Sequence, residues 1–225
     1  LRDARLERQR ELGLVDPAVR PHRPVDIVPW ASLTLEERQA SARKMEIYAA
    51  MVDHLDKAVG RVIAELKASG ELNNTVIVFL SDNGAEARDP PPKPGTASPP
   101  IETLGTAQSY VNYGAGWAQA ASAPFWRFKT FATEGGLRTS AFITGPLVTA
   151  RGEIGRSYTS VRDIVPTVLD SARVRVTPQR FAGRRVQRID GLSWTGMLKR
   201  GSAVYPASKA IGSELFGSRS LRQGD

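Results

Sequence analysis

The sequence predicts an α/β fold, and three consecutive features predict it. An amphipathic pattern covers residues 35–69, an unbroken apolar run follows at 76–80, and the polar turn sequence 81–84 ends that run. A helix followed by a buried strand is the repeating unit of sheets that are covered by helices. We therefore expect a mixed, mostly parallel sheet flanked by helices, with ligands bound where its strands end.

The helix predicted over residues 35–69 carries signals at both ends. Thr34 and Glu37 form a capping-box pattern at its start, and Gly70 supplies the stop. Apolar side chains recur along the segment with alternating spacings of three and four, which places them on one face. These side chains are Met45, Tyr48, Val52, Leu55, Val59, Val62 and Leu66.

The strand predicted at Val76–Leu80 is apolar at every position, so we expect it to be buried on both faces as a central parallel strand. Asp82 and Asn83 follow it in the turn. A carboxylate and an amide oxygen side by side are hard ligands, suited to Ca²⁺ or Mg²⁺. The competing interpretation is that both residues only shape the turn.

The remaining segments predict shorter elements and loops. Irregular structure is expected in the proline-containing residues 1–31, the proline-rich residues 88–100 and the aromatic- and glycine-rich residues 110–126. A short strand is predicted at 141–144, and a bulged strand entering a turn at 214–225. A helix is predicted from the cap Asp163 to about Ala172, because Pro166 is tolerated only in a first turn.

A second candidate site surrounds the pair Gly135–Gly136. Two glycines permit backbone geometry that is closed to other residues and allow close approach to a ligand. Lys129 and Arg138 flank the pair as cations, and Glu134 is placed to orient either one. A cation beside a glycine-rich turn is suited to hold an oxyanion. The competing interpretation is a tight turn with solvated charges.

Composition excludes some classes of site and favours others. The 225 residues contain no cysteine, which excludes disulfides, thiolate metal sites and a cysteine nucleophile within the chain. No apolar run approaches the roughly 20 residues that span a bilayer. The net charge of +8 favours anionic partners, including sulfated and phosphorylated substrates. The arginines of 173–188 and the aromatic loop leave a nucleic-acid-binding surface open as an alternative.

Several segments, in their order and spacing, carry a resemblance to a known family. They are Met45–Asp56, Gly70–Thr75, Ser81–Glu86, Tyr113–Ala118 and Lys129–Thr139. Together they resemble the sulfatases of the alkaline-phosphatase-like superfamily, and especially the bacterial arylsulfatases. The resemblance extends over nearly everything from Leu33 to Asp225.

The resemblance implies a partial alkaline-phosphatase-like sandwich that leads into a smaller C-terminal subdomain. We assign residues 1–172 to the C-terminal portion of the α/β core and 173–225 to the incomplete start of that subdomain. The resemblance also implies that Asp82 and Asn83 coordinate Ca²⁺ (Mg²⁺ in some members) and that Lys129 contacts the substrate sulfate. The expected partner is a small-molecule sulfate ester, with no nucleic acid and no membrane segment.

The chain also departs from the family pattern. Family members use a formylglycine nucleophile, made in a Cys/Ser-x-Pro-x-Arg motif of the N-terminal half, and this motif does not occur here. We therefore expect a segment of a longer arylsulfatase-type sulfuric ester hydrolase, with the formylglycine in the missing N-terminal part and little or no turnover by the segment alone. Two alternatives stay open: a phosphoryl or phosphonate ester hydrolase of the same superfamily, and a non-catalytic basic module that binds anions.

Overall fold

The computed structural model describes residues 1–88, 99–175 and 179–224, which carry a mixture of helices and strands in agreement with the predicted α/β class. With η marking a 3₁₀ helix, the elements in chain order are α1 (Arg2–Glu11), η1 (Trp30–Ser32), α2 (Leu35–Ala68), η2 (Leu72–Asn74), β1 (Ile77–Leu80), η3 (Ile101–Thr103), α3 (Gly114–Ala121), α4 (Glu134–Leu137), β2 (Ala141–Thr144), η4 (Val161–Asp163), α5 (Ile164–Ser171), β3 (Arg180–Phe181), β4 (Arg184–Arg185), α6 (Thr195–Arg200), β5 (Ala210–Leu215) and β6 (Ser218–Gln223).

The chain divides into two compact units, and each is described by itself. Unit 1 comprises Leu1–Gly70, Asn83–Ser140 and Glu214–Ser220. Unit 2 comprises Glu71–Asp82, Ala141–Ser213 and Leu221–Asp225. The boundary between Asp82 and Asn83 therefore falls inside the turn that follows β1.

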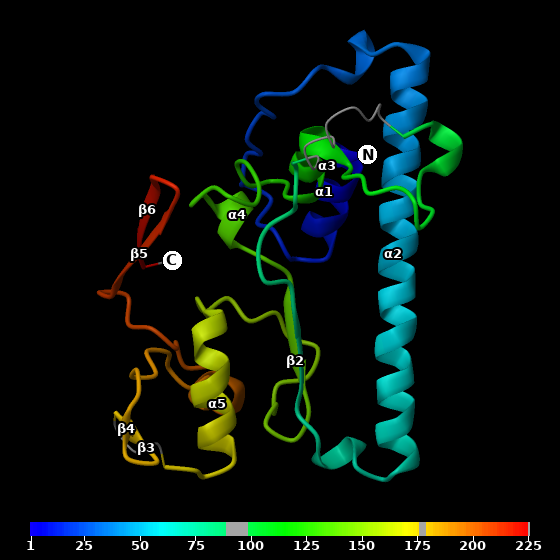
Figure 1. Ribbon diagram of the computed structural model, residues 1–225. Coiled ribbons are helices and arrows are strands. Elements are labelled where there is room, and N and C mark those ends of the chain that lie inside the picture. Colours follow the sequence, from blue (N-terminus) through cyan, green and yellow to red (C-terminus); the bar gives the residue numbers. More distant parts are fainter. Residues whose placement is uncertain (89–98, 176–178, 225) are drawn as a thin grey trace. The chain divides into compact units, whose positions relative to one another are not determined.

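Helix α2 of unit 1 is a single unbroken helix, as the periodicity predicts (Figure 1). Its capping box is confirmed, because the Thr34 backbone N–H donates to Glu37 at 2.8 Å and the Glu37 N–H donates back to the Thr34 hydroxyl at 3.2 Å. These reciprocal bonds satisfy two of the N–H groups that a helix start otherwise leaves unpaired.

The predicted apolar stripe of α2 is covered toward its N-terminal half. Met45 is buried, the Tyr48 ring lies 4.8 Å from the Tyr113 ring, and the Trp117 indole N–H donates to the Ser41 carbonyl at 3.0 Å. Farther along the helix, Val52, Leu55 and Val62 are exposed, whereas Val59 and Leu66 are half-buried. The spacing therefore predicts the face correctly, but only part of that face is buried.

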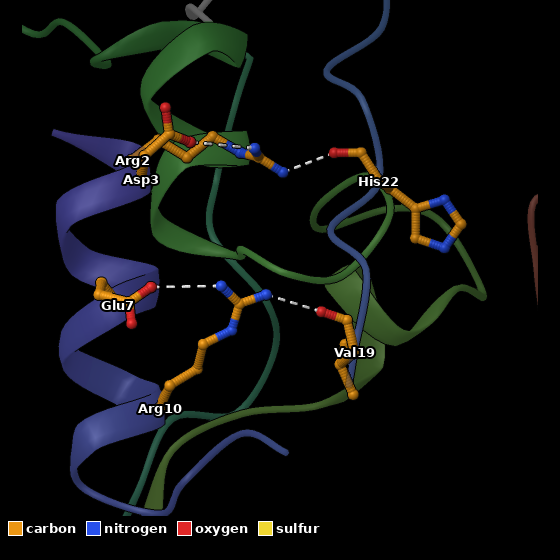
Figure 2. A network of polar contacts seen from close by, with 6 residues as sticks. All are labelled: Arg2, Asp3, Glu7, Arg10, Val19 and His22. Atoms are coloured by element: carbon orange, nitrogen blue, oxygen red, sulfur yellow. Dashed lines mark hydrogen bonds and ion pairs between the residues drawn. The ribbon is translucent and has the colours of Figure 1, made fainter. Parts of the chain in front are cut away.

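The irregular structure predicted for residues 1–31 is wrong at the start, because helix α1 forms at Arg2–Glu11, ahead of the prolines. This helix holds the irregular segment that follows it. Figure 2 shows Arg2 donating to the carbonyl of His22, and Arg10 donating to the carbonyl of Val19 at 2.9 Å. Arg10 also pairs with Glu7 at 3.3 Å. Arg2 and Arg10 thus provide hydrogen bonds to carbonyl groups of a segment that is not part of a helix or sheet.

The prediction of a loop at 110–126 is wrong in part, because helix α3 occupies the middle of this segment. Small residues line much of this helix, and Ala118 is completely buried. Gln119, 4% exposed, accepts from the Val25 N–H at 2.9 Å and donates to the Val25 carbonyl at 2.8 Å. The glycine content concealed a helix whose burial comes from long-range contacts rather than from its own propensity.

Strands β1 and β2 of unit 2 pair with each other in antiparallel orientation, with Ile77 opposite Thr144 and Leu80 opposite Ala141. The Phe79 and Phe142 rings stack across the pair at 5.0 Å. All sheets in the described part of the chain are two-stranded. The mostly parallel sheet was predicted from the apolar run, but for this strand pair the direction is wrong. The predicted burial on both faces is also not met, since all four residues of β1 are half-buried. An apolar run does not by itself fix the direction in which a strand pairs.

Asp163 organises unit 2 in a way that the sequence did not predict. Its carboxylate does not cap α5 but accepts from the backbone N–H of Ser160 at 2.7 Å and of Leu192 at 2.9 Å. The Trp194 indole N–H and the Tyr205 hydroxyl also donate to it, at 3.1 and 2.5 Å. Burial, followed by the hydrogen bond to Asp163 and its charge, raises the pKa of Tyr205. One fully buried carboxylate thus joins three segments: its own turn at 160–163, residues 192–194 and Tyr205.

The arginine-rich stretch contains a small hairpin, in which β3 pairs antiparallel with β4 and Arg180 lies opposite Arg185. The terminal stretch is also a two-stranded sheet, with β5 and β6 joined through Phe216 and Gly217, which both have positive φ (51° and 82°). This geometry is that of a two-residue hairpin turn. Most of the predicted proline-rich loop, residues 89–98, lies outside the described residues. Among the helices that the structure describes, none combines the length and hydropathy needed to cross a bilayer.

The contacts of Asp163 lead to a stability prediction. Replacing Asp163 with Ala leaves four donors, among them the buried Trp194 indole, without their acceptor, and we expect the free energy of unfolding to fall by about 3 kcal/mol. Urea titration followed by circular dichroism measures this change. The control Asp190→Ala removes an exposed carboxylate and should change the value by less than about 0.5 kcal/mol. Equal effects of the two substitutions would contradict the assigned role.

Candidate functional site

The candidate site begins with the turn that follows β1. Asp82, the last residue of unit 2 before the boundary, is exposed, and Asn83, the first residue of unit 1 after it, is half-buried. The Asn83 amide nitrogen donates to the Gly84 carbonyl at 2.9 Å. This bond sets the orientation of the amide, so its oxygen lies on the opposite side of the group from Gly84.

Gly84 packs backbone to backbone against the glycine pair of α4. Its N–H donates to the Gly136 carbonyl at 2.8 Å, and a Cβ at Gly84 would lie 1.9 Å from the Gly135 carbonyl oxygen. Cβ atoms at Gly135 and Gly136 would meet the carbonyl oxygens of Arg127 and Phe131 at 2.2 and 2.1 Å. Each glycine is therefore required by close approach rather than by an unusual φ. This contact joins the two segments that the sequence singled out separately.

Lys129 is fixed to the same turn through its backbone. Its N–H donates to the Ala85 carbonyl at 3.0 Å. Two neighbours, Arg127 (φ 63°) and Thr130 (φ 79°), adopt left-handed backbone conformations. A positive φ at a β-branched residue such as Thr130 is rare and strained, and such conformations concentrate at functional sites.

The Lys129 ammonium pairs with Glu86, with Nζ 3.0 Å from Oε2. The other carboxylate oxygen of Glu86 accepts from the backbone N–H groups of Ala87 and Arg88, each at 2.9 Å. Desolvation raises the pKa of Glu86, but the bond from Arg88, the bond and charge of Lys129 and the bond from Ala87 together hold this pKa below its usual value. Sequence reasoning assigned no role to Glu86, although it lies inside the Ser81–Glu86 segment.

Glu134 was expected to orient either Lys129 or Arg138, and the structure pairs it with Arg138. Their side chains lie 3.5 Å apart, one helical turn from each other on α4 and its C-cap. The Arg138 guanidinium also stacks over the Phe125 ring at 4.8 Å. Arg138 is thus engaged by its own segment, and Lys129 is the cation that lies against the Asn83 turn.

A small apolar cluster lies beneath the turn. It consists of Ala87, Ala118 and Phe128, with Tyr113 packed against it. Desolvation, followed by the neighbouring groups Tyr48 and Glu86, raises the pKa of Tyr113 to about 12, so its phenol keeps its proton at neutral pH. The cluster gives the turn and the Lys129 segment a shared apolar base.

Unit 1 brings Asn83 and Lys129 onto one small scaffold, and Asp82 adjoins Asn83 in sequence. Asp82 and Asn83 supply a carboxylate and an amide oxygen, the donor types that Ca²⁺ and Mg²⁺ prefer. Ca²⁺ takes about 6–8 oxygen ligands, and no group of three or more His, Cys, Asp or Glu side chains suited to a metal occurs among the described residues. These two residues therefore fit a metal ion as part of its coordination shell and do not complete it.

The packing of Gly84 against Gly135 and Gly136 leads to a stability prediction that can be tested with this chain alone. Gly84→Ala forces a Cβ into backbone atoms of Gly135 and Gly136, so we expect loss of the turn and a fall of at least about 3 kcal/mol in the free energy of unfolding. The control is Gly116→Ala on α3, where a Cβ meets nothing within 4 Å and should be neutral or stabilising by up to about 1 kcal/mol. Thermal unfolding of both variants measures the difference. Equal stability of the two would show that the close approach does not hold in solution.

Comparison with known proteins places these features in a family. The sequence profile described as Sulfatase matches residues 18–174. An uncharacterised sulfatase of Schizosaccharomyces pombe is 42% identical over all of this chain, and an arylsulfatase of Klebsiella aerogenes is 33% identical over 76% of it. An arylsulfatase of Clostridium perfringens is 26% identical over 75% of the chain.

The alignment covers only part of each relative. The chain spans 42% of the S. pombe protein, 38% of the K. aerogenes enzyme and 27% of the C. perfringens enzyme. It contains the turn with Asp82 and Asn83 and the segment with Lys129, and the matched profile includes both. Since the profile covers well over half of the 225 residues, the chain belongs to the sulfatase family.

Proposed function

We propose that this chain forms the metal- and sulfate-binding portion of an arylsulfatase-type sulfuric ester hydrolase. The observation that carries the proposal is the joining of two chemically distinct segments through Gly84 and the glycine pair. One segment bears the oxygen ligand Asn83, and the other bears the cation Lys129. The similarity to arylsulfatases of two bacteria supports the same reaction class.

In this proposal, each residue has a limited and definite task. Lys129 contacts a sulfate oxygen and stabilises the negative charge that grows on it during attack at sulfur. Asp82 and Asn83 hold a Ca²⁺ ion, or Mg²⁺, together with ligands from outside these residues. When bound, the ion supplies Lewis-acid neutralisation of the sulfate oxygens. The substrate is a small-molecule sulfate ester.

The nucleophile is not among the residues of this chain. The Cys/Ser-x-Pro-x-Arg motif from which the family makes its formylglycine does not occur in the 225 residues. We therefore expect little or no turnover from these residues alone. From the resemblance to the family, we also propose that residues 1–172 belong to the α/β core and 173–225 to the start of a smaller subdomain.

The sulfate contact is tested by Lys129→Ala in the full-length protein. Loss of a positioned oxyanion donor typically costs about 10²–10³-fold in kcat, and we expect a loss of that size on an aryl sulfate. Lys209→Ala, which removes an exposed lysine of unit 2, is the control and should retain full activity. Turnover of an aryl phosphate in place of the sulfate would favour the phosphoryl or phosphonate hydrolase instead.

Metal binding gives an independent prediction. We expect Asp82→Ala and Asn83→Ala to weaken Ca²⁺ binding by at least about tenfold each in isothermal titration calorimetry, because each removes one hard oxygen ligand. Asp56→Ala, on the polar side of α2, removes an exposed carboxylate away from the turn and should leave the affinity unchanged. Unaltered Ca²⁺ affinity in both turn variants would refute the assignment.

A further inference from the structure

We propose that Glu86 is a positioning residue for Lys129, which sets where the lysine ammonium meets a sulfate oxygen. This inference rests on the proposed function, because it gives Glu86 a role only if Lys129 contacts the substrate. Glu86 touches neither substrate nor metal in this proposal and acts through Lys129. The geometry of three groups carries the inference: the Glu86 carboxylate, the backbone of Lys129 and the Lys129 ammonium.

The Glu86 carboxylate is itself held by backbone. Its Oε1 accepts from the N–H groups of Ala87 and Arg88 at 2.9 Å, so that the acid closes a local turn on its own chain. Ala87 belongs to the buried cluster beneath the turn. The second oxygen, Oε2, is therefore presented from a fixed base, and it is this oxygen that lies 3.0 Å from the Lys129 Nζ.

The backbone of Lys129 is fixed to the residue beside Glu86. Its N–H donates to the Ala85 carbonyl at 3.0 Å, and Thr130 on its other side holds a strained left-handed conformation. The lysine side chain is long and flexible, so its ammonium group could still take many positions. The contact with Glu86 restricts the position of that ammonium group.

The ion pair between Lys129 and Glu86 is better suited to orient the lysine than to stabilise the fold. Both side chains are more than a third exposed, at 40% for Lys129 and 37% for Glu86, and exposed pairs add little to stability. An ammonium has three donors, so one bond to Glu86 leaves others for an oxyanion. A modest pair that costs the fold little when broken can still fix a reacting group, and misplacement by about 1 Å is enough to slow an enzyme about 100-fold.

The first arm of the test reads the pair in the chain itself. Lysine side chains are labelled by reductive [¹³C]methylation, which keeps their charge, and the Lys129 resonance is assigned with Lys129→Arg. We expect Glu86→Gln to move the Lys129 resonance to the position of solvated lysines. Asp53→Asn is the matched control: it breaks the 2.6 Å pair with Lys57 on α2 and should move the Lys57 resonance but not that of Lys129. A Lys129 resonance unchanged by Glu86→Gln overturns the proposal.

The second arm separates positioning from a purely structural role in the full-length protein. Glu86→Gln keeps the cation, so KM for an aryl sulfate should stay within about twofold while kcat falls about 5- to 10-fold. In a Lys129→Ala background the same substitution should change kcat by less than about twofold, because its effect passes through Lys129. An equal loss in both backgrounds overturns the proposal. If Lys129→Ala retains full turnover while the Lys129 resonance still depends on Glu86, the proposed function fails and the side-chain pairing stands.

Discussion

The close packing of Gly84 against Gly135 and Gly136 is the constraint on which the candidate site depends. A Cβ added to Gly84 would lie 1.9 Å from the Gly135 carbonyl oxygen, and Cβ atoms added to Gly135 and Gly136 would lie 2.2 and 2.1 Å from the carbonyl oxygens of Arg127 and Phe131. The approach allows the Gly84 N–H to bond to Gly136, and the Lys129 N–H to bond to Ala85. Without it, Asn83 and Lys129 would belong to separate loops. The glycines therefore set how close the turn that carries Asn83 lies to the segment that carries Lys129.

Unit 2 depends on a constraint of a different kind. There a single buried carboxylate, that of Asp163, gathers the backbone of Ser160 and Leu192 and the side chains of Trp194 and Tyr205. Small units cannot bury enough apolar surface to fix every segment, so a fully satisfied polar centre can specify their arrangement. The same carboxylate would destabilise the unit strongly if one or more of its donors were lost, because it would remain buried with its hydrogen bonds incomplete. Sheet β1–β2 of this unit ends at the turn that carries Asp82.

Local patterns predicted local structure well and long-range structure poorly. Helix α2 and its cap follow from Thr34, Glu37 and the apolar spacing, because these signals act within a few residues. Lys129 and Arg138, the cations that flank the glycine pair, could also be identified from the local sequence. Glu86 could not, because its partner Lys129 is 43 positions away (129 − 86) and nothing in the sequence names that pairing. Asp163 was predicted only to cap a helix. The sequence shows its position just before the helix, but it does not show its contacts with Leu192 and Tyr205.

Charge balance around the candidate site bears on how an anion would be held there. The chain carries a net charge of +8, yet three cations of this region are paired with carboxylates: Lys129 with Glu86 at 3.0 Å, Arg138 with Glu134 at 3.5 Å and Arg127 with Asp26 at 3.2 Å. A surface of paired charges attracts an anion only weakly at a distance, since each pair is close to neutral beyond a few ångströms. On the proposed function, a divalent ion held at Asp82 and Asn83 would add to the attraction for a sulfate ester. The ammonium of Lys129 would contribute at contact range, where its effect on the developing charge depends on its orientation. If the ion attracts the ester and the lysine acts only at contact, a lysine that contacts an oxyanion could keep a carboxylate partner. On the proposed function, the pair would give up long-range attraction and gain a fixed direction at the atom where charge develops.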